Sequence, residues 1–354
     1  MTPSQSIQAA ASTDDAELRT LRSRNTKLLG GSVALGLGAG AALAAGLYGS
    51  AGVMTGAALG ALVGSLGGAS VGAASELARV FQTPNASTPV HLHIQDSGGY
   101  GRPVLLIHGW PLSSEVWWPQ LGALRRAGYR VVMYDRRGFG RSGKAATSYN
   151  YGTLTLDLLR VMDECGLEDV TLVGFDMGCG EVVRFVSTFG EKRLRSVVLA
   201  ATVTPCLMRS PDNTDGPLTA HAAFIERHAL LSDREAYFST YVDRMFLANG
   251  VQLASLPLRD QLKAVCQQSA PQAALACMGA ATRADFREDL SKVHVPTLVV
   301  HGGEDALMPI EASGMPTHLA IANSTLVSLG DAPHGVNQTH PQEFNRALLS
   351  FLAM

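Results

Sequence analysis

Continuous apolar stretches recur along the chain from residue 89 onward, and segments with helical character separate them. The stretches expected to be strands are 104–107, 130–134, 169–174, 195–201, 297–301 and 324–329. The helices expected between or after them are 114–127, 152–166, 178–190 and 340–353. Apolar strands that alternate with helices are typical of a mostly parallel sheet that helices cover on both faces. In such a sheet, ligands bind beyond the carboxyl ends of the strands.

An acidic residue between two glycines follows one of these strands. The stretch Gly174-Phe175-Asp176-Met177-Gly178 has the G-x-S-x-G pattern of a tight strand-to-helix turn, with Asp176 in the place of serine. A carboxylate that attacks an acyl carbon forms a labile anhydride, whereas attack on a tetrahedral carbon forms an alkyl ester that water can hydrolyse. Asp176 is therefore a candidate nucleophile for displacement at a tetrahedral carbon.

Four further motifs carry a family resemblance. They are His108-Gly109-Trp110-Pro111, Tyr134-Asp135-Arg136-Arg137-Gly138-Phe139-Gly140-Arg141-Ser142, Gly180-Glu181-Val182 and Ala332-Pro333-His334-Gly335. With them, residues 85–354 resemble the α/β-hydrolase superfamily, and within it the cofactor-free haloperoxidase, perhydrolase and arylesterase group. That group carries serine at the turn. The aspartate nucleophile instead resembles that of epoxide hydrolases and haloalkane dehalogenases.

The resemblance implies roles for the other site residues. His334, in a loop after the strand 324–329, is the expected base that activates water. Asp305, in the loop after the strand 297–301, is expected to orient that histidine. The backbone N–H groups of Trp110 and Met177 would form the oxyanion hole. The chain order of nucleophile, acid and histidine is the order used by this fold.

Residues 203–290 interrupt the strand pattern and are expected to form a helical cap over an apolar pocket. Tyr237 and Tyr241 in this segment are possible proton donors, because the oxygen of an opening epoxide needs a proton. For both tyrosines, however, a packing role is the stronger interpretation. The expected partners are a small apolar electrophilic substrate and water, and we expect neither a cofactor nor a metal.

The N-terminal part has a different composition. Residues 1–27 are polar and expected to be disordered, whereas no charged residue occurs between 28 and 75. Glycine recurs at every fourth position from Gly52 to Gly72, which predicts a Gly/Ala-rich helical hairpin over 28–80. This hairpin spans a membrane, with the catalytic domain on the cytoplasmic side, or drives self-association of a cytoplasmic oligomer. A signal peptide or a low-complexity linker is the remaining interpretation of the segment. A net charge of −2 offers no electrostatic argument for nucleic acid.

Three functions fit these observations. The first is a hydrolase that forms and hydrolyses an alkyl ester, most directly an epoxide hydrolase; a haloalkane or haloacid dehalogenase is the related alternative. Met177 disfavours the dehalogenase, because such enzymes often place a halide-binding tryptophan directly after the nucleophile. The second function is perhydrolase or esterase-like chemistry of the haloperoxidase type. The third is a membrane-anchored or assembly-forming scaffold.

Overall fold

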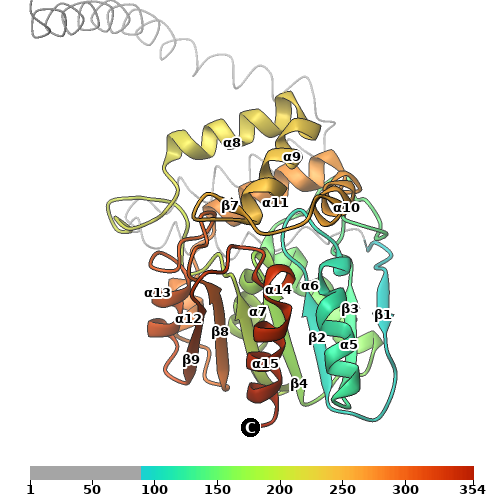
Figure 1. The fold of residues 1–354 in the computed structure, drawn as a ribbon. Coiled ribbons are helices and arrows are strands. Elements are labelled where there is room, and N and C mark those ends of the chain that lie inside the picture. Colours follow the sequence, from blue (N-terminus) through green and yellow to red (C-terminus); the bar gives the residue numbers. More distant parts are fainter. Residues whose placement is uncertain (1–88) are drawn as a thin grey trace, which may run out of the picture. The chain divides into compact units, whose positions relative to one another are not determined.

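A seven-stranded sheet forms the centre of residues 89–354, which are the residues that the computed structural model describes (Figure 1). The strand order is β1-β3-β2-β4-β5-β8-β9. Only the pairing of β1 with β3 is antiparallel within this sheet. The strands are β1 (Ile94–Asp96), β2 (Pro103–Ile107), β3 (Arg130–Tyr134), β4 (Val170–Phe175), β5 (Leu194–Ala200), β8 (Thr297–Gly302) and β9 (Ser324–Leu329). The mostly parallel sheet predicted from the apolar stretches is confirmed.

Helices cover both faces of the sheet, as Figure 1 shows. Helix α5 packs beside α15 on one face, and α6 packs beside α7 on the other. All six residues of β4 are buried, because this central strand has helices on both sides. The covering elements are η1 (Ser114–Trp117), α5 (Trp118–Arg126), α6 (Tyr151–Glu164), α7 (Met177–Phe189), α12 (Arg287–Leu290), α13 (Gly314–Ala320), α14 (Val336–Thr339) and α15 (Pro341–Leu352).

The expected cap is present above the carboxyl ends of the strands (Figure 1). It contains four helices and a short antiparallel hairpin, which lie between β5 and β8 in the sequence. These elements are α8 (Ala220–Ser232), α9 (Arg234–Met245), β6 (Leu247–Ala248), β7 (Val251–Gln252), α10 (Leu256–Gln267) and α11 (Pro271–Arg283). We call this group the cap. Only Leu230 of α8 is buried, so this helix is the most exposed of the four.

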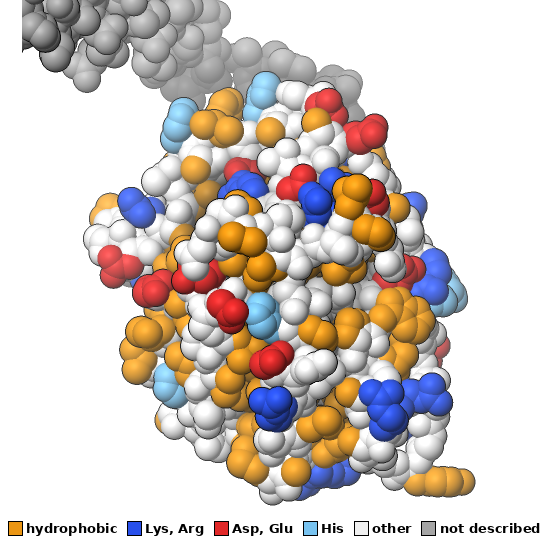
Figure 2. All heavy atoms as spheres, viewed as in Figure 1, with side chains coloured by type: hydrophobic (Ala, Val, Ile, Leu, Met, Phe, Trp, Pro, Cys, Tyr) orange, Lys and Arg blue, Asp and Glu red, His pale blue; other side chains and the backbone are white. Residues whose placement is uncertain are grey.

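The surface carries mixed charges: Figure 2 shows acidic and basic side chains interspersed on the face in view. No helix within residues 89–354 is both long enough and apolar enough to cross a membrane. The predicted tail over 1–27 and the predicted Gly/Ala-rich hairpin over 28–80 lie outside the described residues.

Candidate active site

The turn between β4 and α7 holds Asp176 in a backbone conformation that side chains rarely adopt. Its φ is 50° and its ψ is −117°. Strained backbone of this kind is concentrated at functional sites, where the surrounding structure enforces it. Gly178 lets α7 begin directly against β2, because a Cβ there would lie 2.5 Å from the backbone oxygen of Ile107. The turn therefore presents Asp176 at the carboxyl end of the central strand.

Three side chains from separate loops meet at this point. Asp176 follows β4, Asp305 follows β8 and His334 follows β9, and all three are almost completely buried. The Nδ1 atom of His334 lies 2.8 Å from Oδ2 of Asp305. Its Nε2 atom lies 3.7 Å from Oδ1 of Asp176 and has no hydrogen-bond partner within residues 89–354. The structure thus brings together the three residues expected to act as nucleophile, orienting acid and base.

Asp305 is held by more groups than the sequence indicated. Its Oδ1 accepts hydrogen bonds from the backbone N–H groups of Leu307 and Met308, at 3.0 and 2.8 Å. Its Oδ2 is shared between His334 and His301, whose Nε2 lies 3.2 Å away. Burial alone would raise the pKa of Asp305, but the two imidazoles outweigh burial and place that pKa well below its ordinary value. Asp305 is consequently a stable carboxylate.

His301 was not singled out by the sequence. It is fully buried in β8, and its Nε2 also lies 2.8 Å from the backbone oxygen of Met308. The backbone oxygen of Met308 and the carboxylate of Asp305 can only accept hydrogen bonds, so Nε2 is the donor in both contacts. The sequence offered no signal for this contact, because a histidine inside an apolar strand is indistinguishable from a core residue.

The two backbone N–H groups predicted to form an oxyanion hole lie against Asp176. The N–H of Trp110 donates to Oδ2 of Asp176 at 2.7 Å. Burial raises the pKa of Asp176 above its ordinary 3.8, while His334 and the N–H groups of Met177 and Trp110 act in the opposite direction. One carboxylate oxygen is therefore held by a backbone donor, and Oδ1 is the oxygen that faces the histidine.

The charge state of His334 is set by the two carboxylates. Burial acts to lower the pKa of His334, but the negative charge and hydrogen bond of Asp305 outweigh it. Asp176 adds a smaller upward contribution, so the pKa of His334 lies above its ordinary 6.5. The imidazole thus responds directly to the charge on Asp176.

A buried ion pair lies next to this site and contacts both α7 and the loop after β2. Arg136, which follows β3, pairs with Glu181 of α7 and donates to the backbone oxygen of His108 at 2.6 Å. Tyr134 donates to the second oxygen of Glu181 at 2.9 Å. Burial and then Arg136 lower the pKa of His108 to about 3. The network links the turn helix to the loop that carries Trp110.

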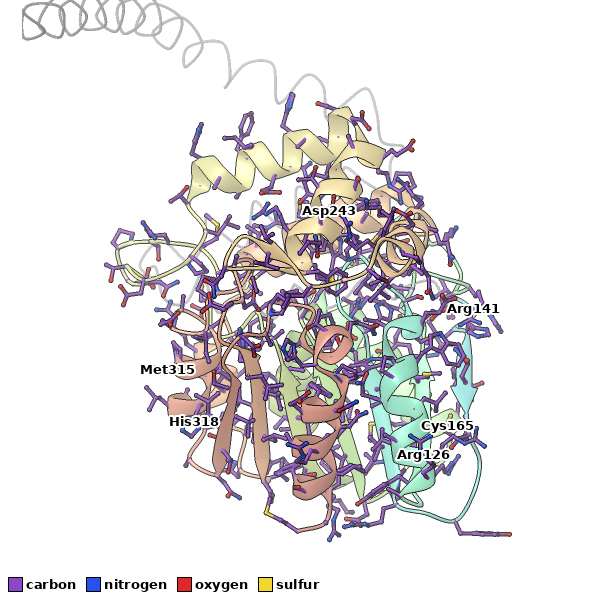
Figure 3. All side chains as sticks on the ribbon, viewed as in Figure 1. Arg126, Arg141, Cys165, Asp243, Met315 and His318 are labelled. Carbon is purple, nitrogen blue, oxygen red and sulfur yellow. The ribbon has the colours of Figure 1, made fainter. Side chains whose placement is uncertain are left out.

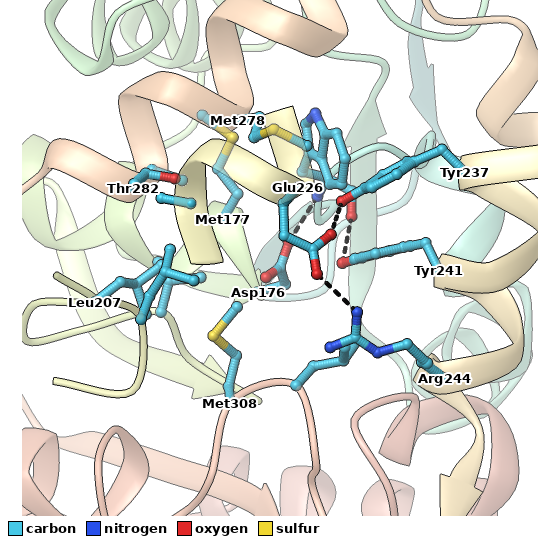
Figure 4. A pocket seen from close by; sticks show the side chains of 16 residues that line it. Asp176, Met177, Leu207, Glu226, Tyr237, Tyr241, Arg244, Met278, Thr282 and Met308 are labelled. Atoms are coloured by element: carbon cyan, nitrogen blue, oxygen red, sulfur yellow. Dashed lines mark hydrogen bonds and ion pairs between the residues drawn. The ribbon is translucent and has the colours of Figure 1, made fainter. Parts of the chain in front are cut away.

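The pocket above Asp176 has a volume of about 130 Å³ and mostly apolar walls, with cap residues forming its roof (Figure 4). Tyr237 and Tyr241 both line it. The hydroxyl of Tyr241 donates to the backbone oxygen of Trp110 at 3.2 Å, and that of Tyr237 donates to Glu226 at 2.7 Å. The structure therefore places both predicted proton donors in the pocket, with their protons engaged by other acceptors.

The sheet, the cap and the three site residues are consistent with a known protein family. The family model for the alpha/beta hydrolase fold matches residues 102–341. The chain belongs to the α/β-hydrolase family. The resemblance stated from the motifs is confirmed, and the enzyme class that it supports is a hydrolase.

Individual relatives within the family point to the haloperoxidase branch. A non-heme chloroperoxidase of Kitasatospora aureofaciens is 36% identical over 72% of this chain and 93% of its own length. A bifunctional esterase/perhydrolase of Acinetobacter calcoaceticus is 28% identical, over 74% and 96%. The crystal structure of a bromoperoxidase from Bacillus anthracis has 42% identity and a TM-score of 0.74, over 75% and 97%. The hydrolase body of this protein is therefore similar to haloperoxidases and to an esterase/perhydrolase.

Proposed function

We propose that this protein is a hydrolase that opens an electrophilic tetrahedral carbon, most directly that of an epoxide, through an ester on Asp176. The observation that carries the proposal is the environment of the carboxylate. Oδ2 accepts the Trp110 N–H at 2.7 Å, and Oδ1 lies 3.7 Å from His334 Nε2. Such a carboxylate is oriented, ionisable and next to a base that has no other hydrogen-bond partner among the described residues.

The first half of the reaction is a displacement. Oδ1 of Asp176 attacks an epoxide carbon, the C–O bond of the ring breaks, and the ring oxygen leaves as an alkoxide. Tyr241 is the proposed donor of the proton that this oxygen takes up. Burial raises the pKa of Tyr241 well above its ordinary value, so the phenol keeps its proton until a strong base such as an alkoxide appears. The pocket's apolar walls keep competing water away.

The second half hydrolyses the ester. His334 takes a proton from water through Nε2, and the hydroxide formed adds to the carbonyl carbon of Asp176. The resulting oxyanion is stabilised by the N–H groups of Trp110 and Met177. The tetrahedral intermediate then collapses, releasing the diol and regenerating the carboxylate. The proton on His334 returns to the tyrosinate, so one epoxide and one water yield one diol.

An epoxide is preferred over an alkyl halide because the indole N–H of Trp110 is already hydrogen-bonded within the protein. Its indole Nε1 donates to the backbone oxygen of Ala274 at 2.9 Å, so this N–H is committed to the cap and is not available to a halide. Ring opening requires an acid, and the hydroxyl of Tyr241, which lines the pocket, is the proposed one. Both features favour the epoxide.

The test is covalent trapping. In a His334→Ala variant, the ester should form but not be hydrolysed, so incubation with a panel of epoxides and alkyl halides should add the mass of one substrate. Peptide mapping should locate the adduct on Asp176, and an Asp176→Asn/His334→Ala variant is the matched control. Absence of an adduct across the whole panel would overturn the displacement mechanism.

Acyl chemistry is the second candidate, and the similarity to an esterase/perhydrolase favours it. In that case the oxyanion hole serves an acyl substrate, and a serine at position 176 would be the better nucleophile. An Asp176→Ser variant that hydrolyses aryl esters, while the parent protein neither does so nor traps epoxides, would support this function over the first.

A further inference from the structure

A charged cluster lies in the otherwise apolar wall of the catalytic pocket. Glu226 of α8 pairs with Arg244 of α9, with 2.9 Å between Oε1 and Nη1. The second carboxylate oxygen of Glu226 accepts the hydroxyl of Tyr237 at 2.7 Å. All three residues line the same pocket as Asp176, and Figure 4 shows the guanidinium and the carboxylate reaching into it from the cap.

The cluster leaves hydrogen-bond donors unused. Both oxygens of Glu226 and the hydroxyl of Tyr237 are engaged within the cluster. Arg244, by contrast, uses only Nη1, and its Nε and Nη2 make no hydrogen bond within residues 89–354. Its side chain is 45% exposed. An arginine offers five N–H donors in a rigid plane, so Arg244 can donate to a ligand without breaking the pair.

The charges of the pocket restrict what that ligand can be. Glu226 already balances the positive charge of Arg244, and Asp305 lies beside His334. Asp176 must be ionised to attack, so a substrate anion would add a second uncompensated negative charge to the same small cavity. Two like charges in a partly desolvated pocket repel strongly. A neutral oxygen that accepts a hydrogen bond does not meet this repulsion.

We propose that Glu226, Tyr237 and Arg244 form a substrate-recognition element for neutral substrates that carry a hydrogen-bond acceptor oxygen beyond the electrophilic carbon. The unused N–H groups of Arg244 donate to an ether, carbonyl or hydroxyl oxygen. Glu226 holds the guanidinium in place and excludes anions, and Tyr237 holds Glu226. The inference rests on the proposed function, because it assigns the substrate class of that same site.

The experiment compares three epoxides of equal length: an alkyl epoxide, one with an ether oxygen in the chain, and one with a terminal carboxylate. We expect Arg244→Met to lower kcat/KM for the ether substrate by roughly tenfold to a hundredfold, since hydrogen bonds to charged groups are worth about 1.5–3 kcal/mol. The alkyl substrate should be little affected. We expect Glu226→Gln to raise kcat/KM for the carboxylate substrate relative to the ether, because the charge of Arg244 is then unbalanced.

The matched control is Arg259→Met. Arg259 of α10 also forms an ion pair in the cap, at 2.8 Å from Asp243, but neither residue lines the catalytic pocket. Figure 3 labels Asp243 in the cap. The control should leave the preference among the three epoxides unchanged. Equal loss on the ether and alkyl substrates in Arg244→Met would show that the pair only ties α8 to α9, and would overturn the proposal.

A binding measurement separates this inference from the proposed function. Dissociation constants of the three epoxides are measured by calorimetry on Asp176→Asn, which cannot form the ester, and on Asp176→Asn/Arg244→Met. The proposal requires tighter binding of the ether than of the alkyl compound, and loss of this difference in the double variant. If no covalent adduct is trapped but the ether epoxide still binds more tightly than the alkyl epoxide, only the proposed reaction is overturned. If the two epoxides bind equally, the recognition element is overturned.

Discussion

Removing the charge of Asp176 should lower the pKa of His334. Asp176→Asn keeps the shape of the side chain and an oxygen that can accept the Trp110 N–H, but it removes the carboxylate that lies 3.7 Å from His334 Nε2. That carboxylate contributes to the raised pKa of His334, together with Asp305. The substitution also imitates the ester intermediate, in which Asp176 carries no charge.

The size of the effect follows from the separation of the two groups. Two unit charges 3.7 Å apart interact by about 4 kcal/mol at an effective dielectric constant of about 20. Loss of this attraction penalises the imidazolium and leaves the neutral imidazole unaffected. The pKa of His334 should therefore fall, although Asp305 continues to favour the charged form. In the reaction, the same fall would make His334 a neutral base once the ester has formed.

The assay is an NMR titration of the histidine rings in the wild type and in Asp176→Asn. The chain has ten histidines, and the His334 resonances are assigned by their loss in a His334→Gln variant. Mass spectrometry should verify that the introduced asparagine has not been deamidated back to aspartate. A pKa of His334 that stays the same or rises in the variant would refute the proposed electrostatic coupling.

Substitutions at three other positions test the supporting structure. His301→Leu removes a hydrogen-bond donor from Asp305, so that Asp305 stabilises protonated His334 more strongly and the pKa of His334 rises. The acidic limb of the pH profile of kcat should therefore move to higher pH. His301→Gln keeps an N–H donor and should shift this limb less. Glu181→Ala leaves Arg136 buried without its partner and should lower the free energy of unfolding in urea by about 3–5 kcal/mol, whereas an unchanged value would contradict the supporting role. Gly178→Ala drives a Cβ against backbone and should lower the melting temperature, at a cost of about 1–3 kcal/mol; an unaltered melting temperature would show that α7 can move.

The residues that could be predicted from sequence are those with local signals. Apolar stretches that alternate with helices indicated the strands at once, because burial on both faces requires such stretches. The turn at Asp176 was recognisable because its two glycines stand at fixed positions within a short segment, and a Cβ at either glycine would press against backbone atoms. Asp305 and His334 were expected from the family resemblance, which assigns these roles to residues in loops after two later strands. The antiparallel edge strand β1 was not predicted, since three residues give too short a pattern.

Other contacts could not be predicted, because they depend on how helices and loops pack in space and not on the spacing of residues along the chain. Glu226 and Arg244 lie on two helices of the cap, and each looks like an ordinary exposed charge on its own helix. His301 reaches Asp305 only because the chain turns back after β8. The packing angle of helices and the path of loops depend on side chains throughout the fold.

Residue types within short segments were enough to establish the family, the sheet and the presence of an aspartate where a hydroxyl nucleophile is usual. The contacts of that aspartate, in contrast, were decided by the packing of segments that are distant in the sequence. This packing placed one oxygen of Asp176 on a backbone N–H and the other near His334, and it brought the charged cluster of the cap into the pocket. Those distances depend on how the cap and the loops pack on the sheet, and they govern both the charge on the nucleophile and the substrates that can reach it.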